Sequence, residues 1–380
     1  MDSISLTAKQ SQQTLDGKQE SKPRIAVIGR LPPPVNGATL ITAKILALLE
    51  DQFELKIFNI STAPVKATPL RLLLTAFRML IAPIWLLGAR LHGIRRLYFV
   101  PDCDDGLIGN ILSIAAARLL GMRCSLHHHN FTYIDKYDWR MAIIDRLIGL
   151  NGMHITLDAT MSARMKQQYC SKAAFTSVGN YFAVTVSHNH ARLPESTPSP
   201  FCIGLLSNLS LEKGLQEAID VLKALVSRGH DSKLILGGPC TDANAMKVLS
   251  QAQEKFGSRI DHRGYLADEG KARFYKDIDL FMFPTRWKAE AQPVVLLEAL
   301  AAGKPILAFS RGGIPQLLGQ VGHLFPQDAS FANESLPIIE SWIADRDLLK
   351  AEGDRSAARA LELVAQGEHE LSALRRSLSG

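Results

Sequence analysis

The sequence contains few cysteines, and none of them belongs to a C-x-x-C motif. Its 380 residues include five cysteines, which are widely separated along the chain. An odd number of scattered thiols does not make a disulfide framework or a zinc-finger pattern, so we expect reduced structural cysteines. Reduced thiols are typical of cytoplasmic proteins, and we therefore predict a cytoplasmic location.

Signals for secretion and for nucleic-acid binding are also missing. The N-terminal segment lacks the apolar core of a signal peptide, and we interpret residues 1–22 as a disordered lead-in. We find no block of Lys and Arg interleaved with aromatic residues, which argues against a nucleic-acid partner. The net charge of +6 permits an acidic ligand or an anionic membrane surface but establishes neither.

The sequence has no long uninterrupted hydrophobic run. Its most apolar stretch, MLIAPIWLLGA at residues 79–89, is interpreted as too short and too interrupted by proline to span a bilayer. The stretch overlaps a helical stripe of apolar residues predicted over residues 70–84. We expect this stripe to pack on the N-terminal sheet, as most amphipathic helices do. The nearby arginines, including Arg71 and Arg78, keep peripheral membrane contact open as the alternative.

The length and the order of apolar runs predict two α/β domains. Hydrophobic content is 47% and charged content 21%, as in ordinary globular proteins. Both halves repeat the order strand, loop, helix, which is typical of a doubly wound sheet with sites at the carboxyl ends of its strands. The polar, proline-rich residues 187–200 have the composition of a linker. We therefore predict an N-terminal domain over residues 23–186 and a C-terminal domain over residues 201–355.

The loop after the first predicted strand carries a distinctive sequence. Strand 24–29 is followed by RLPPPVNG, which ends in Asn36-Gly37 before a predicted helix over residues 39–49. The dinucleotide-binding pattern G-x-G-x-x-G is absent, which argues against an oxidoreductase. Two interpretations of this loop remain open. It is either a plain turn between strand and helix or a ligand-binding loop.

Three consecutive histidines end another predicted strand. Side chains alternate along a strand, so His127 and His129 share one face while His128 points to the other. No Cys, Asp or Glu stands at a supporting spacing, so we expect no metal site. A neutral imidazole can hydrogen-bond a sugar hydroxyl or a developing charge. A pair of structural histidines is the alternative.

Two glutamates in the stretch over residues 279–318 frame the start of a predicted helix. Glu290 precedes the helix and Glu298 lies within it, with seven residues between them. Pro293 suits the first helical turn, and the helix start near Val294 collects unpaired N–H groups that bind phosphate. A carboxylate beside such a site can accept hydrogen bonds from sugar hydroxyls. The pattern suits a ligand that carries both phosphate and sugar.

The two glutamates and their spacing resemble the donor-site signature of retaining glycosyltransferase family 4. The usual Gly-aromatic-Gly after the first glutamate is replaced here by Ala291-Gln292-Pro293, a version that resembles a branch making bacterial surface polysaccharides. Earlier in the C-terminal half, Lys213-Gly214 also match the family. Asn208 stands where the family has an arginine, so Lys213 would supply a larger share of the positive charge that stabilises the diphosphate.

The resemblance implies the GT-B architecture, with two Rossmann-like domains facing each other across a cleft. It also implies that a C-terminal helix, placed at residues 356–380, crosses back onto the N-terminal domain. The implied activity is retaining transfer of a sugar from a nucleotide-diphosphate sugar to a saccharide or lipid-linked saccharide acceptor. The setting would be bacterial surface polysaccharide assembly, with peripheral contact at the inner membrane, and with no metal or further cofactor.

The resemblance also implies roles for single residues. Glu290 would hold the donor sugar, Lys213 would stabilise the departing diphosphate, and Glu298 would hold the ribose hydroxyls. His127 or His129 would touch the sugar or the acceptor. The other residues that the resemblance places at the nucleotide, the phosphates or the acceptor are Asn36, Gly37, Asn208, Gly264, Tyr265, Gln292, Pro293 and Val294.

Three other functions remain as alternatives. A sugar-nucleotide 2-epimerase of the same architecture would change its substrate without an acceptor. A glycosidase would need paired carboxylic acids facing one bond and no activated donor. A noncatalytic, membrane-associated protein would bind a nucleotide sugar without turning it over.

Overall fold

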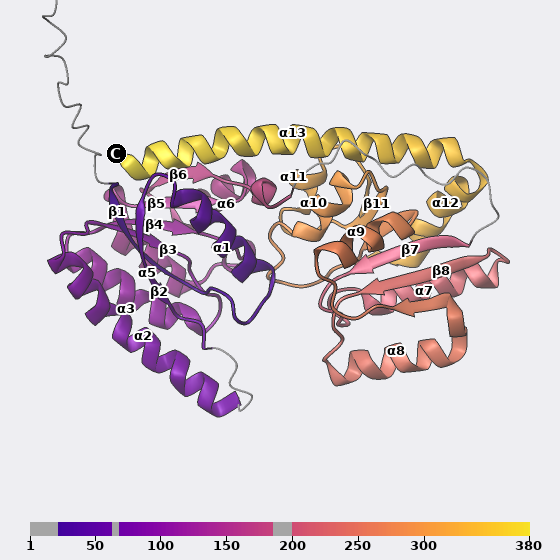
Figure 1. Ribbon diagram of the computed structural model, residues 1–380, viewed down its shortest axis with the longest axis horizontal. Coiled ribbons are helices and arrows are strands. Elements are labelled where there is room, and N and C mark those ends of the chain that lie inside the picture. Colours follow the sequence, from indigo (N-terminus) through magenta and orange to yellow (C-terminus); the bar gives the residue numbers. More distant parts are fainter. Residues whose placement is uncertain (1–21, 63–67, 185–199) are drawn as a thin grey trace, which may run out of the picture.

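The computed structural model describes residues 22–62, 68–184 and 200–380. Two parallel six-stranded sheets, covered by helices, lie side by side along the molecule (Figure 1). The predicted lead-in and linker lie outside the described residues, apart from Lys22 and Pro200. The predicted α/β class and the two doubly wound domains agree with these sheets.

The strands of each sheet come from one half of the chain. The N-terminal sheet contains β1 (Arg24–Gly29), β2 (Glu54–Asn59), β3 (Arg96–Phe99), β4 (Arg123–His127), β5 (Met153–Thr156) and β6 (Ala174–Ser177). The C-terminal sheet contains β7 (Phe201–Leu206), β8 (Ser232–Gly237), β9 (Ile260–His262), β10 (Leu280–Phe283), β11 (Ile306–Phe309) and β12 (His323–Phe325). Their orders are β2-β1-β3-β4-β5-β6 and β12-β11-β10-β7-β8-β9. The order reverses between β1 and β3 and between β7 and β10, and ligands of such sheets bind at these switch points.

The helices connect the strands and cover the sheets. The N-terminal half holds α1 (Gly37–Leu49), α2 (Thr68–Leu91), α3 (Gly106–Leu119), α4 (Thr132–Asp135), α5 (Trp139–Ile148), α6 (Ala159–Tyr169) and the 3-10 turns η1 (Gly149–Asn151) and η2 (Asn180–Ala183). The C-terminal half holds α7 (Leu215–Ser227), α8 (Ala243–Phe256), η3 (Gly257–Arg259), α9 (Asp268–Asp277), α10 (Val294–Ala301), α11 (Ile314–Leu318), α12 (Phe331–Ala344) and α13 (Arg346–Ser379).

The last helix joins the two domains. It was predicted over residues 356–380, but it begins at Arg346, where the side chain of Asp345 caps it, and runs as one helix to Ser379. Leu363 packs in the C-terminal core, whereas Leu374 and Leu378 pack in a core of the N-terminal domain. The helix therefore lies across both domains, as Figure 1 shows, and its return to the N-terminal domain agrees with the expectation.

Helix α2 differs from the prediction in two respects. It is a continuous helix of 24 residues that passes through Pro83, and its residues 73–91 are long and apolar enough to cross a membrane by length and composition alone. The buried residues among the described side chains of α2 are Ala82, Leu86 and Ala89. The predicted stripe instead faces outward, so the expectation that it packs on the sheet is wrong. The side chain of Arg71 is outside the described ones.

Candidate active site

A glutamate–lysine pair lies at the switch point of the C-terminal sheet. Glu290 belongs to the loop after β10, and Lys213 to the loop after the neighbouring strand β7. The Nζ atom of Lys213 lies 2.5 Å from Oε2 of Glu290, which also accepts a hydrogen bond from the Thr285 hydroxyl at 3.3 Å. The Glu290 side chain is only 10% exposed. The fold thus brings together two predicted site residues that are 77 positions apart.

The position of Lys213 is fixed by its neighbours. Its Nζ atom lies 5.5 Å from the centre of the Trp287 ring, within the range of a cation–π contact. Gly214, the next residue, has a φ of +88°, and a Cβ atom there would come within 2.6 Å of the Pro284 carbonyl oxygen. A glycine is therefore needed for the close approach of this loop to the loop that carries Glu290.

Glu298 lies on α10 with one partner for each carboxylate oxygen. The Lys271 amine donates to Oε1 at 2.7 Å, and the Tyr275 hydroxyl donates to Oε2 at 3.1 Å. The side chain stays 19% exposed. Since an ionised carboxylate has about four acceptor positions, two of them remain for hydroxyls of a ligand. Lys271 and Tyr275 come from α9, and no sequence motif pointed to them.

The Gln292 side chain makes contacts that the prediction did not include. Its side chain is buried, and its Oε1 accepts the backbone N–H of Asn180 at 2.5 Å while its Nε2 donates to the Tyr181 hydroxyl at 3.2 Å. The Asn180 side chain also donates to the Gln292 carbonyl at 2.9 Å. The amide thus holds η2 against the start of α10, and the contact of Gln292 with the donor stays a prediction. Pro293 is the N-cap residue, and the helix begins at Val294.

The loop that carries Glu290 is inserted against the N-terminal domain. Ala291 is buried in a core cluster of that domain, and its carbonyl accepts the backbone N–H of Gly313 at 2.8 Å. A Cβ atom on Gly312, whose φ is +55°, would collide with the Glu290 carbonyl oxygen. Arg311 forms an ion pair with Asp135 of α4. The candidate site therefore lies where the two domains meet.

The side chains of the three histidines alternate between two sides, as predicted, but they are not equally buried. The rings of His127 and His129 lie 4.1 Å apart on one side. His128 contacts Tyr133 at 2.9 Å and His154 at 2.8 Å on the other. His127 is fully buried and its Nδ1 contacts the Tyr98 hydroxyl, so it has no exposed surface for the predicted ligand contact. His129 keeps partial exposure and is the remaining candidate.

Burial keeps these histidines neutral. It lowers the pKa of His129 from 6.5 to about 4, and burial together with the neighbouring histidines lowers the pKa values of His127 and His128 well below 6.5. The Nε2 atoms of His127 and His129 are buried without a hydrogen-bond partner in the described part of the chain. A neutral imidazole at this place can exchange hydrogen bonds with a sugar but carries no charge at neutral pH.

These lowered pKa values predict that the protein loses stability in mild acid. Between pH 6.5 and pH 4 the unfolded chain binds a proton that His129 of the folded chain does not bind, so the free energy of unfolding falls as pH falls. We expect a loss of about 1 kcal/mol for each of His127, His128 and His129 between about pH 7.5 and about pH 5.5, measured by urea unfolding. In His129→Asn, the unfolded chain should bind one proton fewer over this pH range, so the free energy of unfolding should depend less on pH. A dependence of equal size in that variant would contradict the assignment.

The remaining predicted residues of the C-terminal domain lie at the carboxyl ends of β7 and β9. Asn208 is exposed, and its amide makes no hydrogen bond within the described residues. The carbonyl of Gly264 accepts the backbone N–H of Gly238 at 2.6 Å, and Tyr265 is 70% exposed. They border the same edge of the sheet as Lys213 and are open to a ligand.

Asn36 and Gly37 begin α1 at the switch point of the N-terminal sheet. The Asn36 side chain accepts the backbone N–H of Thr39 at 3.0 Å and caps the helix, a structural use that the prediction did not include. A Cβ atom on Gly37 would meet nothing within 4 Å. Arg30, which the prediction missed, pairs with Asp102 at 2.5 Å after β1 and β3. Among the residues that the structure describes, no group of three His, Cys, Asp or Glu could hold a metal ion.

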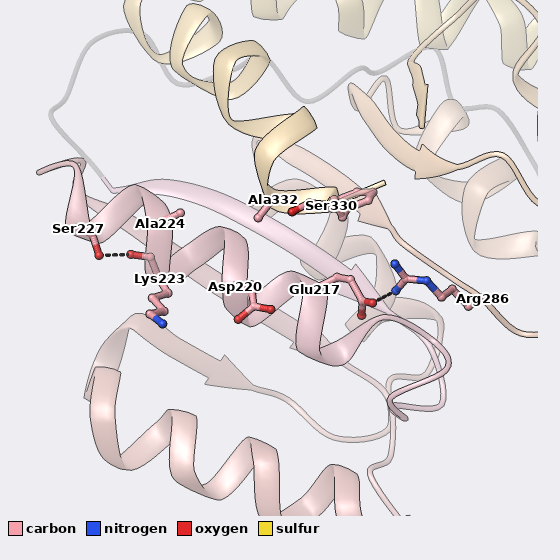
Figure 2. A pocket seen from close by; sticks show the side chains of 9 residues that line it. Glu217, Asp220, Lys223, Ala224, Ser227, Arg286, Ser330 and Ala332 are labelled. Carbon is pink, nitrogen blue, oxygen red and sulfur yellow. Dashed lines mark hydrogen bonds and ion pairs between the residues drawn. The ribbon is translucent and has the colours of Figure 1, made fainter. Parts of the chain in front are cut away.

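A separate hollow lies outside the candidate site. It has a volume of about 460 Å³ and lies between α7 and the start of α12 (Figure 2). Arg286 reaches from the loop into it and forms an ion pair with Glu217, while its guanidinium stacks 4.3 Å from the Phe309 ring centre. These contacts anchor the start of the loop. The hollow itself contains none of the predicted site residues.

Comparison with known proteins supports the predicted resemblance of the C-terminal half to glycosyltransferases. Residues 200–341 match the family model described as "Glycosyl transferases group 1". The amylovoran biosynthesis glycosyltransferase AmsK of Erwinia amylovora is 25% identical over 182 residues, 47% of this chain and 39% of that protein. The putative colanic acid biosynthesis glycosyltransferase WcaL of Salmonella typhimurium is 29% identical over 168 residues, 42% of this chain and 40% of that protein. Each match thus covers less than half of the relative's length.

Solved structures resemble more than nine-tenths of the chain. Sucrose-phosphate synthase from Thermosynechococcus elongatus superposes with a TM-score of 0.71 at 16% identity, covering 94% of this chain and 99% of that chain. Anabaena Alr3699/HepE in complex with UDP superposes with a TM-score of 0.68 at 18% identity, covering 92% of this chain and 100% of that chain. These similarities, together with the two parallel sheets, confirm the predicted GT-B fold.

Proposed function

We propose that this protein, whose C-terminal half matches a group 1 glycosyltransferase domain, is a retaining glycosyltransferase. Its donor is a nucleotide-diphosphate sugar, and its acceptor is a saccharide or a lipid-linked saccharide of bacterial surface polysaccharide assembly. The observation that carries the proposal is the contact between Lys213 and Glu290 at the switch point of the C-terminal sheet. The relatives in amylovoran and colanic acid biosynthesis support the pathway class, and the HepE structures with UDP and UDP-glucose support the donor class.

The proposed reaction breaks the bond between the anomeric carbon of the sugar and the oxygen of the diphosphate. The acceptor hydroxyl forms the new bond on the same face, and its proton passes to the leaving phosphate. Lys213 and the N–H groups at the start of α10 stabilise the negative charge that develops on the diphosphate. We propose that this stabilisation works without a metal ion.

The other side chains position the donor in this proposal. Glu298 accepts hydrogen bonds from the ribose hydroxyls at its free acceptor positions, and Glu290 holds hydroxyls of the donor sugar. His129, neutral because burial lowers its pKa to about 4, exchanges a hydrogen bond with the sugar or the acceptor. A lipid-linked acceptor places the enzyme in peripheral contact with the inner face of the cytoplasmic membrane.

The test is incubation with a panel of nucleotide-diphosphate sugars and with saccharide and lipid-linked acceptors. We expect acceptor-dependent release of the nucleotide and a product whose anomeric configuration, read by NMR coupling constants, equals that of the donor. Inversion would overturn the retaining mechanism. Conversion of UDP-GlcNAc without an acceptor would instead identify an epimerase. Cleavage of unactivated glycosides would identify a glycosidase, and binding without turnover a noncatalytic protein.

A further inference from the structure

Helix α2 presents an apolar stripe to solvent. Its exposed apolar residues recur at alternating spacings of three and four, which places them on one face of the helix. The members of this α2 stripe are Leu70, Leu73, Phe77, Leu80, Ile84, Leu87 and Leu91. The exposed fractions of Leu73, Ile84 and Leu91 are 67%, 69% and 79%. An apolar surface of this extent on a folded domain indicates an interaction site.

The neighbouring helix α3 widens this surface. Helices α2 and α3 pack along each other on the outside of the N-terminal domain (Figure 1). Gly109 allows the close approach, because a Cβ atom there would collide with the Met79 sulfur. Ile108, Leu112 and Leu119 of α3 are exposed by 52%, 45% and 89%. The exposed apolar surface therefore extends over two adjacent helices.

A pocket of arginines lies where both helices end. Gly93 follows α2, Gly121 follows α3, and both glycines line a hollow of about 380 Å³ at the amino ends of β1, β3 and β4. The four charged residues that line it are Arg24, Arg95, Arg96 and Arg123. The Arg96 guanidinium donates to the Ser379 carbonyl of α13 at 2.5 Å.

The described part of the chain leaves the charge of this arginine pocket without a neutralising carboxylate. Within the described residues, the side chains of Arg24, Arg95 and Arg123 form no ion pair with a carboxylate. Helix α2 itself contains three arginines and neither Asp nor Glu. The surface is thus apolar along the two helices and cationic at their ends, which is the complement of anionic lipid headgroups above acyl chains.

The contacts of α2 decide how it can meet a membrane. The Arg78 guanidinium donates to the carbonyls of Asn59 and Ser61, and the Arg90 side chain donates to the Leu120 carbonyl at 3.0 Å. The ring of Trp85 lies 5.4 Å from that of Phe58. With one face held on the domain in this way, α2 can lie in the plane of an interface but cannot cross a bilayer without leaving the domain.

We propose that the α2 stripe, the exposed apolar residues of α3 and the arginine pocket form one docking surface for an anionic phospholipid membrane. The apolar side chains insert among the acyl chains at the interface. The arginines bind the phosphates of anionic headgroups. This docking surface is separate from the site at Glu290, and lipid binding needs neither donor nor sugar transfer.

The test is sedimentation of the full chain with vesicles of two parts phosphatidylcholine and one part phosphatidylglycerol. We expect binding at low ionic strength that weakens as salt is added, and that is lost with pure phosphatidylcholine. The double variant Arg95→Ala/Arg123→Ala should bind the anionic vesicles about 25-fold more weakly, since each arginine near such a surface contributes about 5-fold. Arg273→Ala, an exposed arginine on α9, is the matched control and should bind as the unaltered protein does.

A second pair of variants tests the apolar part. Phe77→Ser/Ile84→Ser should weaken binding at least about tenfold. Leu361→Ser on α13, where the leucine is 44% exposed, should not. Because these positions are exposed, the variants should keep the circular dichroism spectrum of the unaltered protein. No binding to anionic vesicles, or binding unchanged in both double variants, would overturn the proposal. Light scattering that shows a dimer dissociated by Phe77→Ser/Ile84→Ser, without vesicle binding, would overturn it in favour of a second copy as the partner.

Discussion

Lys213→Ala is expected to lower the rate of sugar transfer by about 100- to 1000-fold. The Lys213 amine is the cation placed at the switch point, 2.5 Å from Glu290, and Asn208 supplies no second positive charge where the related family has an arginine. Removing it leaves only the N–H groups at the start of α10 to stabilise the diphosphate as it departs. The rate constant for a single turnover with saturating donor measures this effect.

Two further variants separate lost catalysis from lost folding. Without Lys213, the carboxylate of Glu290 stays nearly buried without its cation, which is unfavourable for the fold. The double variant Lys213→Ala/Glu290→Gln should regain thermal stability but not activity. Lys223→Ala, which alters an exposed lysine on the neighbouring helix α7, should leave both unchanged. Transfer at an undiminished rate by Lys213→Ala would remove this residue from the mechanism.

Glu298→Ala is expected to weaken binding of the nucleotide by about 10- to 100-fold. Hydrogen bonds to a charged group contribute about 1.5–3 kcal/mol, and the ribose would lose its carboxylate partner. Titration calorimetry with UDP, the nucleotide bound in the HepE structure, measures the dissociation constant. If another base is preferred, the corresponding diphosphate replaces UDP.

The structure offers a matched control for Glu298. Glu334, in the first turn of α12, is an exposed glutamate of the same domain, and Glu334→Ala should bind the nucleotide normally. Glu298→Gln keeps one acceptor oxygen and the size of the side chain, so its affinity should fall between those of Glu298→Ala and the unaltered protein. An unchanged dissociation constant in Glu298→Ala would show that the ribose binds elsewhere.

The buried strands could be predicted from the sequence because both faces of a parallel sheet are covered. The run LFMF of β10 and the run ILAF of β11 are entirely buried and read as short apolar segments. The edge strand β2, ELKIFN, was missed because it is largely exposed and mixes charged with apolar residues. Helix α9 was missed because Phe274 and Tyr275 are its only buried residues.

The site residues that belong to a sequence motif could be predicted. The burial of a side chain, and its contacts with residues far away in the sequence, could not. Glu290, Glu298 and Lys213 came from matched motifs, and two of them meet in the structure. The spacing of His127 and His129 gives a shared face, but it cannot show that His127 is fully buried. Likewise, nothing in the local sequence shows that the Gln292 amide binds η2, because that contact spans the domain junction. The outward-facing α2 stripe was missed because an amphipathic pattern does not say which side meets the protein.

The insertion of the Glu290 loop between the domains has a consequence for the proposed mechanism. Gln292 is hydrogen-bonded to η2 and Ala291 packs in the N-terminal core, so movement of one domain relative to the other is transmitted to Glu290. Helix α13 links both domains along a second path. Domain closure over a donor could therefore assemble the site and exclude water.

The central claim is that Lys213, Glu290 and Glu298 form one donor site for a nucleotide-diphosphate sugar. The most direct test is the thermal unfolding of the unaltered protein and of the Lys213→Ala/Glu298→Ala double variant with a panel of such sugars. A ligand present at about 100 times its dissociation constant stabilises the folded state by about 2.7 kcal/mol. We predict that at least one sugar nucleotide raises the melting temperature of the unaltered protein and not that of the double variant. No increase with any sugar nucleotide, or an equal increase in both proteins, would contradict the account.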